Sequence, residues 1–301
     1  MKLAYLREWY EKMTVIELEN KLYPKILKNI KKAPKKLYIN GNLDILNSNC
    51  IAIVGSRKNT KYGEKWCKKF AQEFIKYNLT IVSGMALGID KIAHKTAIRN
   101  GGKTIAVLPS GLENIYPEEN LELYNEIILN GGCVISEYEP KIKASSKNFL
   151  ERNRIVSGLS LGTVVIEAAY RSGTSVTAKI AKEQGRDVFC IPGSLDNPKS
   201  IGTNNLIKEF AKIVTSPKDV INNYNFLHKI EVNSNTLVEE QIPEEYKKIY
   251  SLITDIPINI NDIAKKSLLE LREVSSKLTM LELDGKVVKL PGNMYIRGDL
   301  D

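Results

Sequence analysis

Between residues 51 and 222 the same pattern of hydrophobicity recurs along the chain. A short run of apolar, often β-branched residues is followed by a turn and then by a segment with helical periodicity. Apolar runs without polar alternation are typical of strands covered on both faces, as in a parallel sheet with crossover helices. Between the first two runs, Trp66, Phe70 and Phe74 recur at four-residue intervals, as a helix buried on one face requires. Residues 51–222 are therefore predicted to form one doubly wound α/β domain. Its predicted strands are Ile51–Gly55, Leu79–Ser83, Lys103–Leu108, Cys133–Ser136, Thr163–Ile166, Asp187–Ile191 and Ile213–Thr215.

The chain carries 44 Lys and Arg against 35 Asp and Glu, a formal net charge of +9. The excess lies before residue 240, because residues 240–301 hold nine basic and eleven acidic side chains (9 − 11 = −2). A positive excess favours a polyanionic partner such as nucleic acid, although many proteins are basic without one, so charge alone leaves both interpretations open. A hydrophobic content of 43% in 301 residues supports one large core and one small domain, and excludes a disordered or fibrous chain.

The four cysteines, Cys50, Cys67, Cys133 and Cys190, are far apart in the sequence and form no CxxC pair. They are interpreted as reduced core thiols, not as a metal site or a disulfide framework. The first residues, MKLAYLREWYEK, lack the apolar run of a secretory signal, and no run of about eighteen apolar residues occurs in the chain. A cytoplasmic protein without membrane contact is expected.

Residues 1–50 are predicted to be a short basic helical segment, with a helix near Leu3–Leu22. Ten Lys and Arg stand here against five Asp and Glu, and six of the lysines lie between residues 25 and 36. We interpret these lysines first as a solvated face and only second as a binding site.

Residues 223–239 are polar and weakly patterned, and they are predicted to be a linker. Residues 240–301 show three helical patterns and then two strand-like runs around the turn Pro291-Gly292-Asn293. Three helices and a hairpin are the layout of a winged helix. The prediction is a small C-terminal winged-helix-like domain.

A glycine-containing turn, Gly55-Ser56-Arg57, follows the first predicted strand. In doubly wound sheets, ligands bind at the carboxyl ends of strands, where loops lead into helix N-termini. Glycine lets a phosphate approach the backbone, and Arg57 adds a charged, forked donor. Taken alone, the turn is equally consistent with an ordinary connection. Neither GxGxxG nor GxxxxGK[ST] occurs, so hydride transfer with a dinucleotide and P-loop ATP hydrolysis lose their main support.

The second turn runs from Ser83-Gly84 to Asp90, and His94 follows one helical turn later. At this spacing the side chains of Asp90 and His94 can meet on one helix face. A catalytic pair would also need a nucleophile or a metal, and the sequence offers neither. A structural role in holding the loop by hydrogen bonds is the preferred interpretation.

The segment Lys147–Arg154 places an aromatic residue and two arginines near a predicted helix start. Arginine binds phosphate and stacks on bases, and an aromatic ring such as Phe149 offers a sequence-tolerant stacking surface. The alternative is that Arg152 or Arg154 forms a salt bridge with an acidic neighbour, Glu137, Glu139 or Glu167. We expect that alternative for at most one of the two.

Further turns complete the edge, namely Ser172-Gly173-Thr174, Pro192-Gly193-Ser194 and the segment that begins at Ser200. Several anion-friendly turns along one sheet edge suit an extended polyphosphate better than a single small molecule. The edge is therefore interpreted as a nucleic-acid surface.

The order of these motifs resembles the DprA/Smf family of DNA-processing proteins over about residues 23–222. The motifs are IAIVGSR, IVSGMALGIDKIAH, GGKTIAVLPSGLENIYP, VISEY, NFLERNRIVSGLS, VVIEA with SGTSVTA, GRDVFCIPG and SIGTNNLI. Residues 240–301 resemble the C-terminal module of the family more loosely. Many members carry a longer helical N-terminal domain, of which residues 1–22 would hold only a remnant.

The resemblance implies a Rossmann-like domain that binds single-stranded DNA, protects incoming or exposed strands, and helps RecA load onto DNA in natural transformation or homologous recombination. It also implies a homodimer, and we expect no catalysis, cofactor or metal. The expected DNA-binding residues are Gly55, Ser56, Arg57, Ser83, Gly84, Lys147, Phe149, Arg152, Asn153, Arg154, Ser172, Gly173 and Thr174. The expected dimer contacts, on a late helix, are Leu206, Ile207 and Phe210.

Two alternatives belong to other functional classes. A nucleotide hydrolase similar to Rossmann-like phosphoribohydrolases would carry PGGxGTxxE. Gly162-Thr163 and Glu167 match this only in part, because no PGG precedes them and Glu167 lies one residue too far. A transcriptional regulator that reads duplex DNA with its winged helix is disfavoured by the acidic charge of residues 240–301, which favours a protein contact instead.

Overall fold

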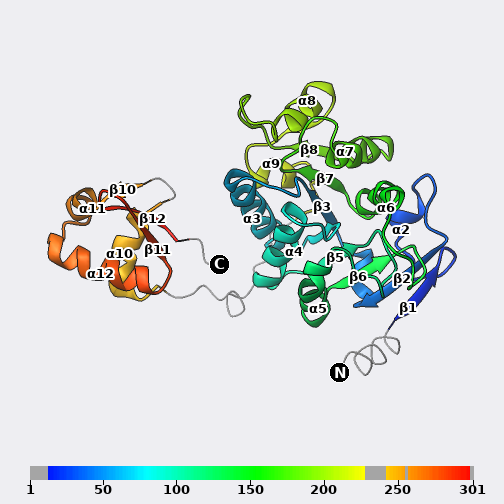
Figure 1. Ribbon diagram of the computed structural model, residues 1–301, viewed down its shortest axis with the longest axis horizontal. Helices are drawn as coiled ribbons and strands as arrows, with labels where there is room; N and C mark the ends of the chain where they lie inside the picture. Colours follow the sequence, from blue (N-terminus) through cyan, green and yellow to red (C-terminus); the bar gives the residue numbers. More distant parts are fainter. Residues whose placement is uncertain (1–12, 228–241, 255–256, 299–301) are drawn as a thin grey trace. The chain divides into compact units, whose positions relative to one another are not determined.

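The computed structural model describes residues 13–227, 242–254 and 257–298. The chain forms two compact units, residues 1–236 and residues 237–301 (Figure 1). The larger unit carries every residue that the sequence predicts to bind DNA. Its architecture therefore decides the geometry of the candidate site.

Within the described residues, the larger unit is built on a nine-stranded sheet with the order β1-β2-β6-β5-β4-β3-β7-β8-β9. The seven strands from β6 to β9 in this order are all parallel to one another, as the apolar runs predict. The strands are β1 Thr14–Glu17, β2 Lys36–Gly41, β3 Cys50–Val54, β4 Thr80–Ser83, β5 Thr104–Val107, β6 Cys133–Ser136, β7 Gly162–Val165, β8 Asp187–Cys190 and β9 Lys212–Ile213.

The strand order reverses between β3 and β7. The chain passes from β3 through β4 and β5 to β6, and then returns to β7 on the other side of β3. β3 and β7 pair in parallel, with Ala52 opposite Thr163. At such a switch point the loops that leave neighbouring strands diverge to opposite faces and open a crevice. This is the place in the fold where a ligand site is expected.

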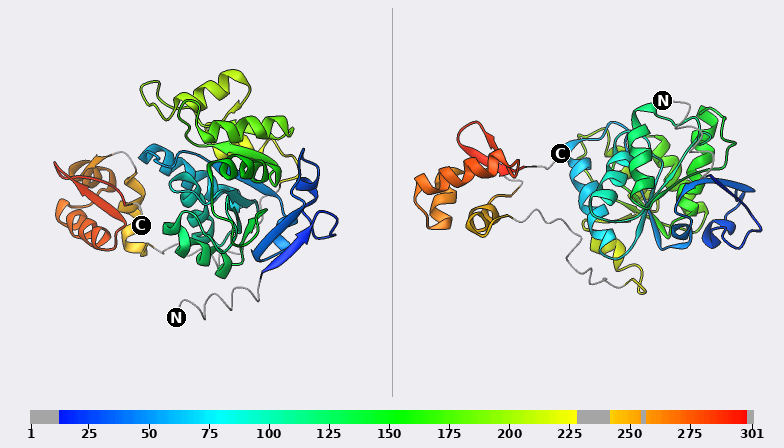
Figure 2. Two further views of the ribbon diagram at one scale, coloured as in Figure 1. Left: turned by 45° about the vertical axis from the view of Figure 1, so that its right-hand side comes forward. Right: turned by 90° about the horizontal axis from the view of Figure 1, so that it is seen from below.

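Helices cover both faces of the sheet, so the doubly wound prediction is confirmed (Figure 2). Alternate side chains of β3 enter two different cores, with Ala52 and Val54 in one and Ile51 and Ile53 in the other. The first core is covered by α2 Lys25–Lys28, α6 Ser146–Gly158, α7 Gly173–Glu183 and α8 Ile201–Glu209. The opposite face is covered by α3 Lys61–Ile75, α4 Ile89–Arg99, α5 Leu121–Leu129 and α9 Pro217–Ile221.

The helix predicted near Leu3–Leu22 is wrong where the structure describes it. Thr14–Glu17 forms β1, which pairs antiparallel with β2, and β2 pairs antiparallel with β6. Ile16 of β1 enters the core while its neighbours face outward, so sheet pairing satisfies the backbone and buries the apolar side chain together. The sheet domain thus includes residues that were assigned to a separate segment 1–50. Residues 3–12 of the predicted helix lie outside the described residues.

The smaller unit has the winged-helix layout that was predicted. Its elements are α10 Glu244–Leu252, β10 Ile258–Asn259, α11 Ile260–Ser267, α12 Leu271–Leu283, β11 Val287–Leu290 and β12 Met294–Arg297. The strands form an antiparallel sheet in the order β10-β12-β11. Ile249, Ile263, Val274 and Leu278 pack its core. Residues 228–239 of the predicted linker lie outside the described residues.

The cysteines are free and buried, as interpreted from the sequence. Burial raises the pKa of the Cys50 thiol to about 12, so this thiol stays protonated at neutral pH. None of the helices that the structure describes is long and apolar enough to span a membrane.

Asp90 and His94 of α4 turn to different partners. Asp90 Oδ2 accepts a hydrogen bond from Gly84 N (3.1 Å), whereas His94 Nδ1 lies 2.7 Å from Thr104 Oγ1. The Thr104 hydroxyl donates to Ile81 O at 2.7 Å, so it accepts from the Nδ1–H of His94. His94 Nε2 has no hydrogen-bond partner among the described residues. Burial, with the Arg152 charge adding to it, lowers the pKa of His94 to about 3.

We expect this histidine to make the fold acid-sensitive. An unfolded histidine has a pKa of about 6.5, so the lowered folded value gives stability that is full above pH 6.5 and is lost as pH falls toward 3. At about 1.4 kcal/mol per pH unit, the free energy of unfolding should fall by about 2–3 kcal/mol between pH 6.5 and 4.5 through this group. Urea unfolding at the two pH values measures the fall. In His94→Asn, whose amide can still reach Thr104, the free energy of unfolding should fall by less between the two pH values. An equal fall in both proteins would show that His94 is not its cause.

Candidate nucleic-acid interface

A pocket of about 700 Å³ lies at the carboxyl ends of β3 and β7, where the strand order reverses. Its walls are the turns after β3 and β4, the inner side of α6 and the start of α7. Most of the predicted DNA-binding residues line it, namely Gly55, Ser56, Arg57, Gly84, Phe149, Arg152, Asn153, Ser172, Gly173 and Thr174. Segments up to about 120 residues apart in sequence are thereby brought to one place.

The turn after β3 is held to the start of α7. Thr174 Oγ1 donates to Gly55 O at 3.1 Å, and Ser172 Oγ accepts from Ser175 N at 3.3 Å as the N-cap of α7. The other side of the turn rests on Gly88, whose φ of +78° and close approach to the Ser56 carbonyl leave no room for a Cβ. The glycine turn and the N-terminus of α7 therefore lie side by side at the pocket, and a helix N-terminus attracts an anion.

Arg57 and two aromatic rings stand together at the pocket. The guanidinium carbon of the exposed Arg57 lies 4.8 Å from the centroid of the Phe149 ring. Phe149 in turn meets Tyr116 edge-on, with ring centroids 5.4 Å apart. Tyr116 is 45% exposed and lines the pocket. No role was predicted for Tyr116 from the sequence, although it lies in the motif GGKTIAVLPSGLENIYP, in the loop after β5, and ligand contacts are common after the carboxyl ends of strands.

Arg152 is buried beneath the pocket instead of reaching out of it. Its Nη1 donates to Gly84 O at 2.6 Å and also to Val107 O, so it ties the ends of β4 and β5 to α6. Burial lowers the pKa of Arg152 to about 10, against the raising effect of Asp90, and the group remains charged at neutral pH. Burial also disfavours the charged form of Asp90 and so raises the pKa of its carboxyl group. The Arg152 charge is the largest effect that acts against this rise. The pair and the Gly84 amide form a polar floor, and a Cβ at position 84 would collide with the guanidinium.

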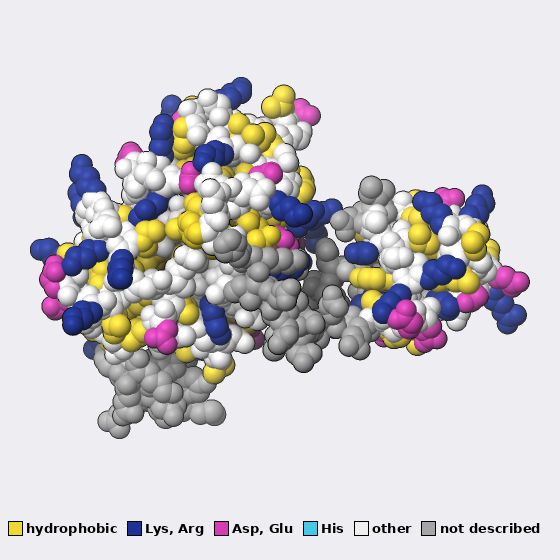
Figure 3. Space-filling view, turned by 180° about the vertical axis from the view of Figure 1, so that it is seen from behind, with side chains coloured by type: hydrophobic (Ala, Val, Ile, Leu, Met, Phe, Trp, Pro, Cys, Tyr) yellow, Lys and Arg dark blue, Asp and Glu magenta, His cyan; other side chains and the backbone are white. Residues whose placement is uncertain are grey.

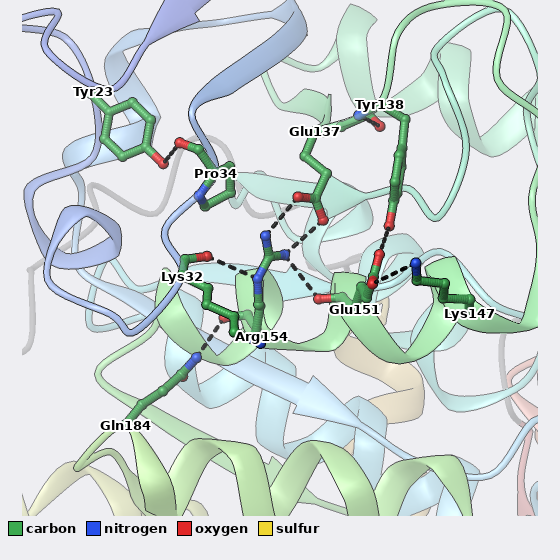
Figure 4. A network of polar contacts seen from close by, with 10 residues as sticks. Tyr23, Lys32, Pro34, Glu137, Tyr138, Lys147, Glu151, Arg154 and Gln184 are labelled. Carbon is green, nitrogen blue, oxygen red and sulfur yellow. Dashed lines mark hydrogen bonds and ion pairs between the residues drawn. The ribbon is translucent and has the colours of Figure 1, made fainter.

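Arg154 is held in an ion pair with Glu137, which is the salt-bridge alternative that we expected for at most one of the two arginines. Its Nη1 and Nη2 lie 2.7 and 2.6 Å from the two carboxylate oxygens of Glu137, and Nε donates to Lys32 O at 3.0 Å (Figure 4). The exposed fractions of the two side chains are only 18% and 16%. Both arginines are therefore engaged, one with backbone carbonyls and one with a carboxylate.

Breaking this pair should cost stability more than DNA binding. Arg154→Met leaves Glu137 partly buried without its counter-charge, and we expect the free energy of unfolding to drop by about 3 kcal/mol. The double variant Arg154→Met with Glu137→Leu should recover much of that loss. Chemical unfolding measures both. If Arg154→Met left stability unchanged but abolished nucleic-acid binding, Arg154 would be a phosphate ligand after all.

Lys147 and Ser83 do not line the pocket. Ser83 is fully buried and donates to Ile53 O at 2.7 Å, so it is part of the sheet. Lys147 is 79% exposed on the outer side of α6 and lies 3.7 Å from Glu151. Of the two, only Lys147 is accessible to a ligand.

The predicted dimer contacts face the core of their own subunit. Leu206 is 2% exposed and belongs to the core beneath α7 and α8, and Ile207 and Phe210 pack partly buried against the same core. The apolar side of α8 packs against this core. Leu206 is therefore not available to a partner subunit, and its assignment is wrong.

Glu167, the acidic residue of the partial nucleotide-hydrolase motif, does not line the pocket. It is buried and accepts hydrogen bonds from the Thr60 amide at 2.9 Å and from the Thr60 hydroxyl, at the start of α3. Both carboxylate oxygens of Glu167 therefore hold the start of α3. Among the described residues, no three His, Cys, Asp or Glu side chains gather in a way that could hold a metal ion.

Two comparisons decide the family. Residues 14–225 match the family model of DNA recombination-mediator protein A, and residues 236–293 match that of the DprA winged helix domain. The chain belongs to the DprA/Smf family. Protein Smf of Escherichia coli K12 is 36% identical over 288 residues, which cover 94% of this chain and 77% of that protein. The DNA processing protein DprA of Streptococcus pneumoniae R6 is 44% identical over 223 residues, which cover 74% of this chain and 78% of that protein.

Solved structures of DprA proteins share the fold. The X-ray structure of DprA from Streptococcus pneumoniae matches with a TM-score of 0.68 and 42% identity, over 75% of this chain and 79% of that one. DprA from Helicobacter pylori, described for its single-stranded DNA binding mode, matches with a TM-score of 0.64 and 34% identity, over 70% of this chain and 95% of that one. The Rossmann-like and winged-helix assignments made from the sequence are confirmed.

Proposed function

We propose that this DprA/Smf protein binds single-stranded DNA in the pocket between the ends of β3 and β7, without turnover, as part of DNA processing in transformation or recombination. The observation that carries the proposal is the exposed Arg57 guanidinium, which lies over the Phe149 ring between a glycine turn and the start of α7. A cation, an aromatic surface and helix amides in one pocket match the phosphates and bases of a single strand. The single-stranded DNA binding described for DprA of Helicobacter pylori supports the same reading.

In this proposal the pocket residues have two kinds of role. Arg57, the glycine turn and the first turn of α7 hold phosphate, while Phe149 and Tyr116 stack on bases. Arg152 acts as a positioning residue, because it ties the β4 and β5 ends that form the pocket floor. Phosphates and the faces of bases are common to all sequences, so base specificity should be slight.

Family membership further supports protection of incoming or exposed strands, delivery of the bound strand to RecA, a homodimer and a cytoplasmic location, and these belong to the same proposal. Two pockets on one strand would gain affinity through linkage. The homodimer would have to use a surface other than Leu206, which lies in the core. Sedimentation of the full chain at several concentrations tests the dimer.

The absence of turnover is supported by the position of Glu167, whose carboxylate is bonded to Thr60. A hydrolase of nucleoside monophosphates would release free base. Incubation of the protein with nucleoside monophosphates, followed by chromatography for free base, tests for this activity. Released base that is lost in Glu167→Gln would replace the binding proposal with the hydrolase alternative.

Arg57→Ala should weaken binding to all single-stranded oligonucleotides to a similar extent. Loss of one charge-assisted phosphate contact corresponds to about 1.5–3 kcal/mol, or roughly ten- to a hundredfold in Kd, and the slope of log K against log salt should become shallower by about 0.7. Fluorescence anisotropy over a salt series measures both quantities. Arg99→Ala, an exposed arginine in the last turn of α4, removes the same charge away from the pocket and should bind normally. A sequence-selective loss, or an equal loss in Arg99→Ala, would overturn the pocket assignment.

A further inference from the structure

The lysine-rich segment between α2 and β2 lies along the outer side of α6. Leu27 and Ile30 pack where a Cβ on Gly158 of α6 would stand, at 2.9 and 3.0 Å. Arg154 Nε donates to Lys32 O at 3.0 Å, and Arg186 Nη2 donates to Ile26 O at 2.9 Å. Contacts with residues more than 100 positions away therefore fix this segment beside the helix that also forms the inner wall of the pocket.

Three lysines of the segment are exposed and uncommitted. Lys28 and Lys36 form ion pairs with Glu19 and Glu17, at 2.9 and 3.1 Å. The exposed side chains of Lys31, Lys32 and Lys35 have no ion-pair partner within the described part of the chain. Uncompensated cations that stand together on a fixed backbone attract a polyanion.

The nearby carboxylates do not cancel this charge. Glu137 is neutralised by Arg154, and Glu151 is shared between Lys147 (3.7 Å) and the Tyr138 hydroxyl (3.1 Å), as Figure 4 shows. In these neighbouring segments Lys31, Lys32, Lys35, Lys147 and Arg154 outnumber Glu137, Glu139 and Glu151, which gives 5 − 3 = +2, and the pairs Lys28–Glu19 and Lys36–Glu17 add no net charge. At the edge of the larger unit where β1, β2 and α2 lie, on the left in Figure 3, several Lys and Arg side chains stand with a group of Asp and Glu side chains between them.

Lys147 connects the pocket to these lysines. It lies in the first turn of α6, next to the pocket residues Ser146 and Phe149. Arg154, which holds Lys32, follows 154 − 147 = 7 residues later, about 10 Å along the helix axis. At roughly 3.4 Å per nucleotide in a stacked strand, about three nucleotides span that distance.

We infer that a single strand leaving the pocket passes Lys147 and continues along the outer side of α6 onto Lys31, Lys32 and Lys35, which together form a basic strip. The strip binds phosphates of the same strand as the pocket and therefore lengthens the site without reading bases. This inference rests on the proposed function, since it needs a strand in the pocket. The lysines do not form the pocket, so the two can be tested apart.

The test compares a short and a longer oligothymidine, of about 6 and about 12 nucleotides, in anisotropy titrations over a salt series. The triple variant Lys31→Gln, Lys32→Gln, Lys35→Gln removes three charges, keeps polar side chains at these positions and leaves the Lys32 carbonyl in place. Its control, Lys69→Gln, Lys208→Gln, Lys218→Gln, makes the same change in net charge on α3, α8 and α9. We expect the strip variant to bind the longer oligonucleotide roughly tenfold more weakly, with a slope of log K against log salt that is shallower by about 2 (0.7 × 3). The short oligonucleotide should bind the strip variant and the unchanged protein with the same affinity.

Each outcome bears on one proposal. If the unchanged protein fails to bind the short oligonucleotide and Arg57→Ala makes no difference to the longer one, the pocket proposal fails. If the short oligonucleotide binds through Arg57 but the strip variant binds the longer one with unchanged affinity and slope, the strip is wrong and its lysines serve another partner. An equal loss in the control variant would reduce the effect to net charge and would also overturn the strip.

Discussion

The position of helix α6 depends on two of its arginines, Arg152 and Arg154, which point to opposite sides of the helix. Arg152 reaches under the pocket and bonds the carbonyls at the ends of β4 and β5, whereas Arg154 reaches outward to Glu137 on the strand-end side of β6 and to the Lys32 carbonyl. Charged groups with so little exposure are costly to bury, and they persist because each finds several acceptors. The helix is thereby locked in orientation, and the pocket on one side and the lysine segment on the other both depend on it.

This arrangement separates the cations that build the site from those that can bind a ligand. Arg152 and Arg154 use their donors within the protein, so they position the walls of the site. Arg57 and the lysines beside α6 are exposed. An exposed cation loses little hydration before it meets a phosphate, and its contribution to binding is screened by salt. The binding surface is therefore expected to respond strongly to ionic strength, while the fold beneath it does not.

The two antiparallel strands at the start of the described chain serve the same surface. β1 and β2 extend the sheet past β6, and the segment between them turns back over α6. Antiparallel strands need no crossover helix between them, so the segment that joins β1 to β2 can pack against α6 instead. Lysines near the N-terminal end of the sequence are in this way placed next to a helix that begins at residue 146.

The sequence by itself determined the doubly wound sheet, the winged helix and most of the pocket, because unbroken apolar runs, glycine turns and a helix stripe at four-residue spacing each depend on local periodicity. Gly55, Arg57, Phe149 and Thr174 could be found this way, since the carboxyl ends of parallel strands meet at one edge. Only the tertiary structure decided that Arg154 is consumed by Glu137, that Leu206 faces inward, that Thr14–Glu17 is a strand, and that Tyr116 joins the site. Whether a charged or apolar side chain is free depends on which distant neighbour packs against it, and that choice follows from how the helices and the edge hairpin cover the sheet.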